Sequence, residues 1–216
     1  GYALFGSLAA IDAVRTAGGR HPRCVVLVEC SEESGSVDLP AYVDHLADRL
    51  RTPRLVICLD SGCGDYQRVW STVSLRGLAL VRVRVDVLTV GLHSGSVGGL
   101  VPSSFAVLRQ LLDRVEVPAT GAIKLPEFHV DIPADRHAEM ADAAALLGRS
   151  SDEMPWAGDT RPLVDDAAEQ LAARTWRPAM AVTGAGGWPA MEAAGNVLRA
   201  YTELNLSFRL APGCDA

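Results

Sequence analysis

The sequence lacks basic clusters and long apolar runs. It holds one lysine, Lys124, and its 20 Lys and Arg residues against 26 Asp and Glu residues give a formal net charge of -6. Proteins that bind nucleic acids gather basic residues into patches, so no such partner is expected. The longest apolar stretches have the length of strands, far below the roughly 20 residues that a membrane-spanning helix needs. We therefore expect no membrane-embedded segment.

The sequence also lacks a secretory start and a paired set of cysteines. It opens on apolar residues at helical spacing, "GYALFGSLAAIDAVRTAGG", without a basic start or a small-residue cleavage site. Its five cysteines are an odd number, and three lie in or beside apolar runs, where reduced cysteines are common. Cys58 and Cys63 have no second cysteine pair to complete a zinc knuckle. These features predict a cytoplasmic protein.

What is present is the composition of a globular protein, with 49% apolar and 21% charged residues. After the opening helix come an apolar run at 24–30, a helical pattern at 36–50 and a second apolar run at 54–60. Runs that are apolar on both faces are typical of parallel strands covered by helices. The first part of the chain therefore predicts an α/β domain with a mostly parallel sheet.

From about Leu75 the pattern changes to alternating apolar and polar residues, which indicates an antiparallel strand with one wet face. An amphipathic helix is predicted at 103–115 and a second one at 162–176, with helical patches such as "AEMADAAALL" between them. Strands are predicted at 179–185 and 203–210. We expect an α+β sandwich with two helices on one face of an antiparallel sheet.

Three carboxylates follow the two apolar runs of the first part. Glu32 and Glu33 come after the first run, and Asp60 ends the second. The carboxyl ends of parallel strands meet at one edge of a sheet, where carboxylates repel one another unless a cation gathers them. One glutamate could bind a metal while its neighbour handles a proton. The alternative is a polar loop with its acids near a helix N-terminus, and spacing alone does not decide.

Five blocks carry a family resemblance, and they read "VECSEESGS", "VICLDSG", "STVSLRGL", "LHSGSVGG" and "GNVLRAYTELNLSFRLAP". In order and spacing they resemble the zinc-dependent aminoacylase and dipeptidase family, which includes carnosine dipeptidase, carboxypeptidase G and acetylornithine deacetylase. The resemblance implies that Glu32 is the general acid/base that activates water. It also implies that Glu33 is a ligand of one zinc ion and Asp60 a ligand of the other.

The resemblance further implies a lid domain inserted into the catalytic domain. Residues 1–75 would be a partial catalytic domain, 76–210 the lid that forms a homodimer, and 211–216 the start of the return. His93 would reach the partner's active site and donate to the developing oxyanion. By itself His93 would fit a turn histidine bonded to local backbone.

The resemblance also implies a small-molecule substrate with a free carboxylate. Arg209 would bind that carboxylate, because its guanidinium suits two oxygens. Asn196 would help to hold the substrate, although related dipeptidases have a threonine there. Without the resemblance, Arg209 would read as an outward-facing strand residue.

Several ligands of the family do not occur in this sequence. They are a His-x-Asp motif on a strand upstream of the first block, a bridging aspartate immediately before a segment like "GYALFGSLAA", and a histidine downstream of the last strand, and no histidine follows His137. We therefore expect an internal fragment of a dinuclear zinc hydrolase that cleaves a dipeptide or an N-acyl amino acid, inactive as this chain alone. Two alternatives stay open: a dimerisation or interaction module, and a decayed paralogue that binds a ligand without turnover.

Overall fold

The computed structural model describes residues 2–215, and the chain divides into two compact units. The first unit is Gly1–Trp70 and the second is Ser71–Ala216. The mixed α/β character expected from the sequence is present. The roles of catalytic part and lid stay predictions.

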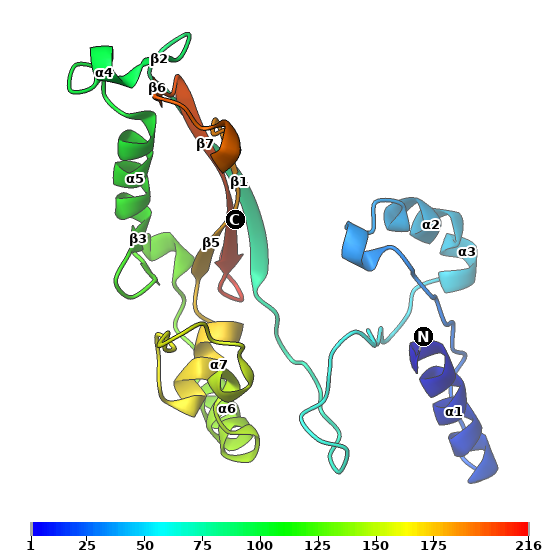
Figure 1. The fold of residues 1–216 in the computed structure, drawn as a ribbon. Coiled ribbons are helices and arrows are strands. Elements are labelled where there is room, and N and C mark those ends of the chain that lie inside the picture. The colour runs from blue at the N-terminus through cyan, green and yellow to red at the C-terminus, as the bar shows by residue number, and fades with distance from the viewer. Residues whose placement is uncertain (1, 216) are drawn as a thin grey trace. The chain divides into compact units, whose positions relative to one another are not determined.

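The first unit is built from short helices (Figure 1). Helix α1 is Tyr2–Thr16, as the apolar spacing predicts. The helix predicted at 36–50 forms in two pieces, α2 at Leu39–His45 and α3 at Ala47–Leu50, with the break at Leu46.

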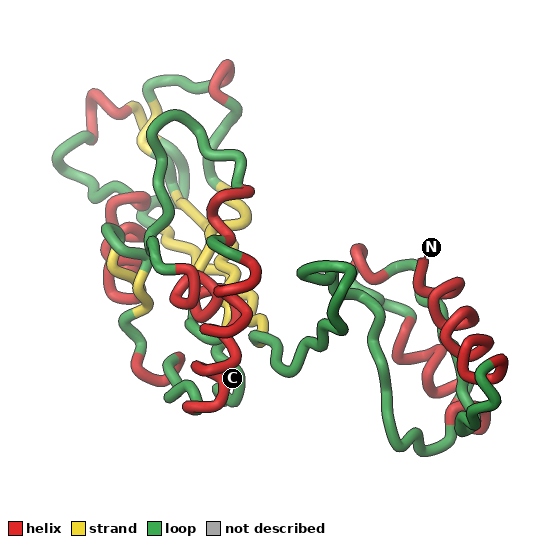
Figure 2. Tube along the Cα trace, turned by 90° about the horizontal axis from the view of Figure 1, so that it is seen from below, coloured by secondary structure: helices red, strands yellow, loops and turns green. Residues whose placement is uncertain are grey.

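The two parallel strands predicted at 24–30 and 54–60 are not formed, so this part of the prediction is wrong for the structure. Both segments run without regular secondary structure, and the strands drawn in Figure 2 all lie in the second unit. Their apolar side chains are exposed, for example Val28 at 55% and Leu55 at 74%. A parallel strand needs hydrogen-bonded neighbours and cover on both faces. Residues 2–70 supply neither.

The second unit is built on a three-stranded antiparallel sheet, as the alternating pattern predicts. Its order is β1 (Gly77–Asp86), β7 (Tyr201–Leu210) and β5 (Ala179–Gly186). The pairing of β1 with β7 runs from Gly77 opposite Leu210 to Asp86 opposite Tyr201. The pairing of β5 with β7 is interrupted by a bulge between Val182 and Gly184.

Helices and two small strand pairs complete the second unit. Strand β2 (Leu92–His93) pairs with β6 (Val197–Leu198), and β3 (Glu116–Val117) pairs with β4 (Ala122–Ile123). Among the helices, α5 packs against β1 and β7, whereas α7 packs against α6 rather than beside α5 on the sheet. The remaining bounds are α4 Ser94–Val97, α5 Ser104–Val115, η2 Pro126–Phe128, α6 Ala134–Leu147, η3 Ser150–Glu153, α7 Ala167–Thr175 and η4 Met191–Ala193.

The core of the second unit lies between β7 and α5. Alternate residues of β7 from Leu204 to Leu210 are buried and pack with Leu108 of α5. Phe128 contacts Phe208 edge-to-face, with ring centroids 5.4 Å apart. Because side chains alternate along a strand, the other residues of β7 belong to the opposite, outer face of the sheet. That set is Tyr201, Glu203, Asn205, Ser207 and Arg209.

Replacing Leu108 by alanine is expected to lower the free energy of unfolding of the second unit by about 2–5 kcal/mol, because Leu108 is fully buried and would leave a cavity. Denaturant unfolding measures this. Leu100→Ala is the matched control, since Leu100 is 82% exposed and its loss should change stability by less than about 0.5 kcal/mol. Equal effects of the two substitutions would contradict the assignment of the core.

The sequence predicts reduced cysteines in apolar runs and no membrane-embedded segment. All five cysteines are free thiols, but four of them are exposed rather than packed in apolar strands. Among residues 2–215, no helix combines the length and the apolar character needed to cross a membrane.

Candidate functional site

The adjacent glutamates lie in a tight turn. Glu32 and Glu33 open the 3-10 helix η1 (Glu32–Ser34), which ends at Gly35 with φ 89. The N–H of Gly35 donates to the carbonyl of Glu32 at 2.8 Å, and the N–H of Ser36 donates to the carbonyl of Ser31 at 3.0 Å. A 3-10 helix has three residues per turn, so neighbouring side chains point about 120° apart. The two exposed carboxylates therefore aim in different directions.

Asp60 lies in the irregular segment after the second apolar run and is exposed. Within the described part of the chain, no three His, Cys, Asp or Glu side chains are grouped so that they could hold a metal ion. The expected cluster of Glu32, Glu33 and Asp60 is therefore not assembled. The physical reason is that the strands whose ends would bring these carboxylates to one edge are not paired.

Glu33 and Asp60 are the two residues of this chain that the family resemblance assigns as zinc ligands. Zinc sites take four ligands, of which protein supplies at least three. Glu33 and Asp60 would give one carboxylate to each of two ions. The residues of this chain do not by themselves fit a zinc site, and the roles given to Glu32, Glu33 and Asp60 stay predictions.

Two other predicted residues are brought together at one end of the second unit. His93 ends β2 and lies opposite Val197 of β6. The N–H of Ser94 donates to the carbonyl of Asn196 at 2.9 Å. His93 and Asn196 are far apart in the sequence, yet they lie on adjacent segments held by the small β2–β6 ladder beside the end of the main sheet (Figure 1).

The hydrogen bonding of His93 defines its useful proton. Its Nδ1 accepts a hydrogen bond from the N–H of Gly95 at 3.1 Å, which caps the short helix α4. A ring nitrogen that accepts carries no proton, so the neutral ring holds its proton on Nε2. The exposed side chain can present this N–H as a donor.

Two glycines allow this arrangement. A Cβ on Gly95 would lie 2.9 Å from Cε1 of His93, and a Cβ on Gly91 would lie 2.8 Å from Cγ1 of Val197. Both approaches are closer than real Cβ contacts, so the sequence "GLHSG" suits the close packing of the β2–β6 ladder around His93.

Arg209 lies at the opposite end of the sheet. It is exposed on the outer face of β7, with Leu78 of β1 and Ala179 of β5 as its cross-strand neighbours. It lies eight positions along β7 from Tyr201, which begins the strand beside the His93 end, a span of about 27 Å. The structure therefore does not bring Arg209 together with His93 and Asn196 within one chain.

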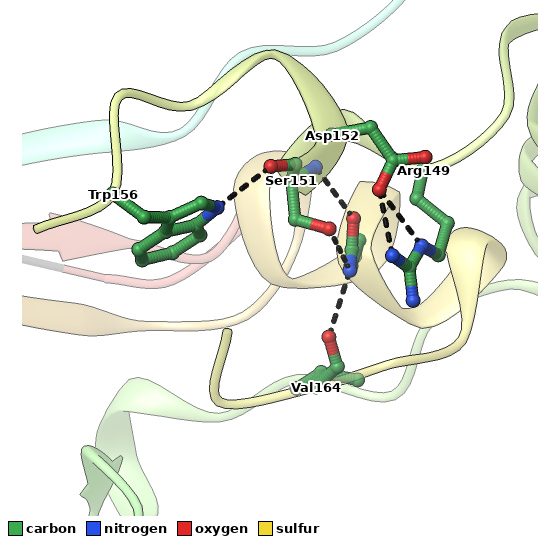
Figure 3. Close-up of polar contacts among 6 residues, drawn as sticks. Arg149, Ser151, Asp152, Trp156 and Val164 are labelled. Carbon is green, nitrogen blue, oxygen red and sulfur yellow. Dashed lines mark hydrogen bonds and ion pairs between the residues drawn. The ribbon is translucent and has the colours of Figure 1, made fainter. Parts of the chain in front are cut away.

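A hollow of about 460 Å³ that no sequence pattern predicts lies between η3 and the segment that precedes α7. Figure 3 shows the polar contacts that join η3 to the segment preceding α7 and to α7 itself. Gln170 of α7 donates to the carbonyl of Val164 at 2.8 Å and to Oγ of Ser151 at 2.9 Å, and accepts from the N–H of Ser151 at 3.0 Å. Trp156 Nε1 donates to the carbonyl of Ser151 at 2.9 Å.

This network is structural. Gln170 and Ser151 are buried and satisfy one another, and Arg149 is paired with Asp152 at 2.7 Å. The only signal in the sequence would have been a glutamine on the buried side of an otherwise amphipathic helix.

Replacing Gln170 by leucine is expected to lower the free energy of unfolding by about 1–3 kcal/mol, because it leaves the carbonyl of Val164 and the N–H of Ser151 without partners. Hydrogen exchange should quicken at the Ser151 amide before the sheet opens. Gln110→Leu on α5 is the control, since Gln110 is exposed. Unchanged exchange at Ser151 in the Gln170 variant would refute the role of the network.

The comparisons with known proteins bear on the whole chain. No protein-family model matches it. A cysteinylglycine-S-conjugate dipeptidase of Corynebacterium striatum is 27% identical, over 94% of this chain and 43% of that protein. The predicted resemblance to dipeptidases is confirmed. The chain spans less than half the length of this dipeptidase relative.

Solved structures show the same fold. Human carnosine dipeptidase 1 matches with a TM-score of 0.62 and 22% identity, over 96% of this chain and 44% of that one. The dipeptidase Dug1p of Saccharomyces cerevisiae gives 0.59 and 21%, over 99% and 45%. An M20-family metallo-carboxypeptidase of Sulfolobus solfataricus gives 0.60 and 21%, over 87% and 42%. Two dipeptidases and one metallo-carboxypeptidase thus share this fold over most of the chain.

Proposed function

We propose that this chain is part of a cytoplasmic dinuclear zinc hydrolase that cleaves the amide bond of a dipeptide or an N-acyl amino acid. The dipeptidase relative, 27% identical over nearly the whole chain, supports the reaction class. The observation that carries the proposal is the β2–β6 ladder. It sets His93 beside the segment of Asn196, two residues that the family resemblance assigns to one site.

The first unit contributes the acid–base chemistry in this proposal. Glu32 accepts a proton from the attacking water and later returns it to the leaving amine. Glu33 and Asp60 would each supply one carboxylate to a zinc ion, which when bound would polarise the attacking water and the scissile carbonyl. The proposal requires further metal ligands from protein outside these 216 residues, so this chain alone is expected to lack peptidase activity.

The second unit contributes substrate recognition. The His93 ring donates its Nε2–H to the oxygen of the scissile carbonyl as that oxygen becomes negative, an interaction strongest in the transition state. Arg209 binds a free carboxylate of the substrate through two parallel N–H groups. Asn196 assists in holding the substrate from the His93 end.

The separation of His93 and Arg209 supports a homodimer. A dipeptide spans only about 7 Å when extended, much less than the length of β7 between the two ends. One substrate therefore cannot touch His93 and Arg209 of the same chain. A site that uses both residues takes one of them from another subunit. In this proposal His93 acts in the active site of the partner subunit, with the second unit as the lid that forms the dimer.

A dimerisation module without catalysis is the second candidate. The second unit has a core of its own, centred on Leu108 and β7, as a module that folds without the first unit requires. Glu32→Gln in the complete metalloenzyme separates the two functions. Loss of turnover with retention of zinc supports the hydrolase, whereas a module dimerises in sedimentation experiments without metal and shows no dependence on Glu32.

A further inference from the structure

Three arginines of the second unit converge where β7 ends. Arg76 lies one residue before β1, and Arg209 lies opposite Leu78 of β1. Since side chains alternate along an extended chain, Arg76 lies on the same side of β1 as Leu78, and therefore on the face of Arg209. Arg174 lies in the last turn of α7, which leads into β5 at this end of the sheet (Figure 1).

Hydrogen bonds fix the position of Arg76. Its Nη1 donates to the carbonyl of Ala173 at 3.1 Å and to the carbonyl of Arg177 at 3.2 Å. Both acceptors flank Arg174 at the end of α7. The contact therefore ties the residue before β1 to the end of α7 and brings the guanidinium of Arg76 to the turn that carries Arg174.

The positive charge of this cluster is not neutralised by the chain. In residues 2–215, none of the ion pairs involves Arg76, Arg174 or Arg209, whereas the nearby Arg177 is paired with Glu169. Burial, followed by the positive charges of Arg209 and Arg174, lowers the pKa of the Arg76 guanidinium. The electrostatic repulsion between like charges held together in this way decreases when an anion binds between them.

The end of α7 explains only part of the cluster. Carbonyl groups at a helix C-terminus attract a cation, which accounts for the contacts of Arg76 and for a basic residue in the last turn. It does not account for Arg209, which comes from a strand and has no acceptor among the described residues. One guanidinium binds one carboxylate through two oxygens, so three guanidiniums exceed what a single carboxylate uses.

We propose that Arg76 and Arg174 extend the carboxylate site of Arg209 into a site for two acidic groups. The ligand is then a dipeptide or N-acyl amino acid whose C-terminal residue is aspartate or glutamate. This inference rests on the role of Arg209 in the proposed function. Arg209 holds the terminal carboxylate, and the acidic side chain of the ligand lies near Arg174 and Arg76. Arg76 also braces α7, so Arg174 is the specificity residue that can be changed with least effect on the fold.

Calorimetric titration of the 216-residue chain tests this with two probes of the same shape, N-acetylglutamate and N-acetylglutamine. The wild-type chain is expected to bind N-acetylglutamate about tenfold more tightly, because a charged hydrogen bond is added. Arg174→Gln should bring the ratio close to one and leave the binding of N-acetylglutamine unchanged. Arg109→Gln, an exposed arginine of α5, should keep the wild-type ratio.

Three results would overturn the inference. They are equal binding of the two probes by the wild-type chain, binding of neither probe, and an unchanged ratio in the Arg174 variant. The test needs neither turnover nor metal, so it is independent of the hydrolase proposal. If the complete protein hydrolyses dipeptides but shows no preference for acidic ligands, the proposed two-acid site is wrong and the hydrolase proposal stands. A failed Glu32 assignment would leave the measured preference in place.

Discussion

In the zinc hydrolase proposed above, Glu32→Gln is expected to lower kcat by about a hundred- to ten-thousand-fold while zinc content stays the same. Glutamine has the size of glutamate, and Glu32 is exposed at the start of η1, so the turn that presents it is preserved. The amide cannot accept a proton, and the attacking water then loses its base. Steady-state kinetics and metal analysis on the same preparation measure both quantities.

The neighbouring glutamate gives the contrast that makes this result specific. Glu33→Gln removes a proposed metal ligand, so it should lower zinc content as well as turnover. Asp44→Asn is the charge control, because Asp44 is an exposed carboxylate of α2 in the same unit. It should leave kcat and zinc content unchanged. Full turnover in the Glu32 variant, or loss of zinc from it, would refute the acid–base role.

Local patterns were sufficient for most of the second unit. The alternation at 203–210 predicts the side of β7 that is buried, and the helix predicted at 103–115 is α5. Its N-cap Ser103 accepts from the N–H of Ala106 at 3.4 Å, and Asp166 caps α7 by accepting from the N–H of Glu169 at 2.9 Å. The helix predicted at 162–176 is α7, but it begins at Ala167, five residues later than predicted, after the Asp166 cap. The side-chain period of these elements is local, so it is readable from the sequence.

The first unit shows what local patterns omit. The runs at 24–30 and 54–60 have the residue types of buried strands, but a strand exists only if neighbours complete its hydrogen bonds. Because no strand is formed in residues 2–70, Glu32, Glu33 and Asp60 are not collected at one edge. The predicted cluster of the three carboxylates therefore depended on both runs pairing as neighbouring strands. The carboxylates themselves carry no information about that pairing.

The family resemblance names the site residues of the second unit, but it does not predict which other residues lie around them. Nothing near His93 in the sequence indicates that Asn196 lies beside it, since the β2–β6 ladder joins distant segments. The contacts of Arg76 with the end of α7 and those of Gln170 with Ser151 are tertiary in the same way. A charge cluster or a buried amide network becomes visible only when the chain is folded.

His93→Asn is expected to lower kcat by about a hundred- to a thousandfold, the effect of losing one donor to an oxyanion. The Oδ1 of asparagine lies where it can still accept from the N–H of Gly95, the bond that Nδ1 of His93 makes at 3.1 Å. The shorter side chain does not reach the position of Nε2. The local fold of α4 should therefore persist while the donor is lost.

Mixing of inactive subunits decides whether His93 acts in its own subunit or in the partner. Equal amounts of the Glu32→Gln and His93→Asn enzymes, dissociated and reassociated, should give about a quarter of the wild-type activity per subunit, since half of the dimers are mixed and each has one intact site. Mixing Glu32→Gln with Glu33→Gln should give no recovery, because both residues belong to the same half of each site. If His93 acts within its own chain, every site in the first mixture carries one defect and activity stays at the level of the single variants. That outcome would remove the partner role of His93, and with it the explanation for why His93 and Arg209 lie at opposite ends of one sheet.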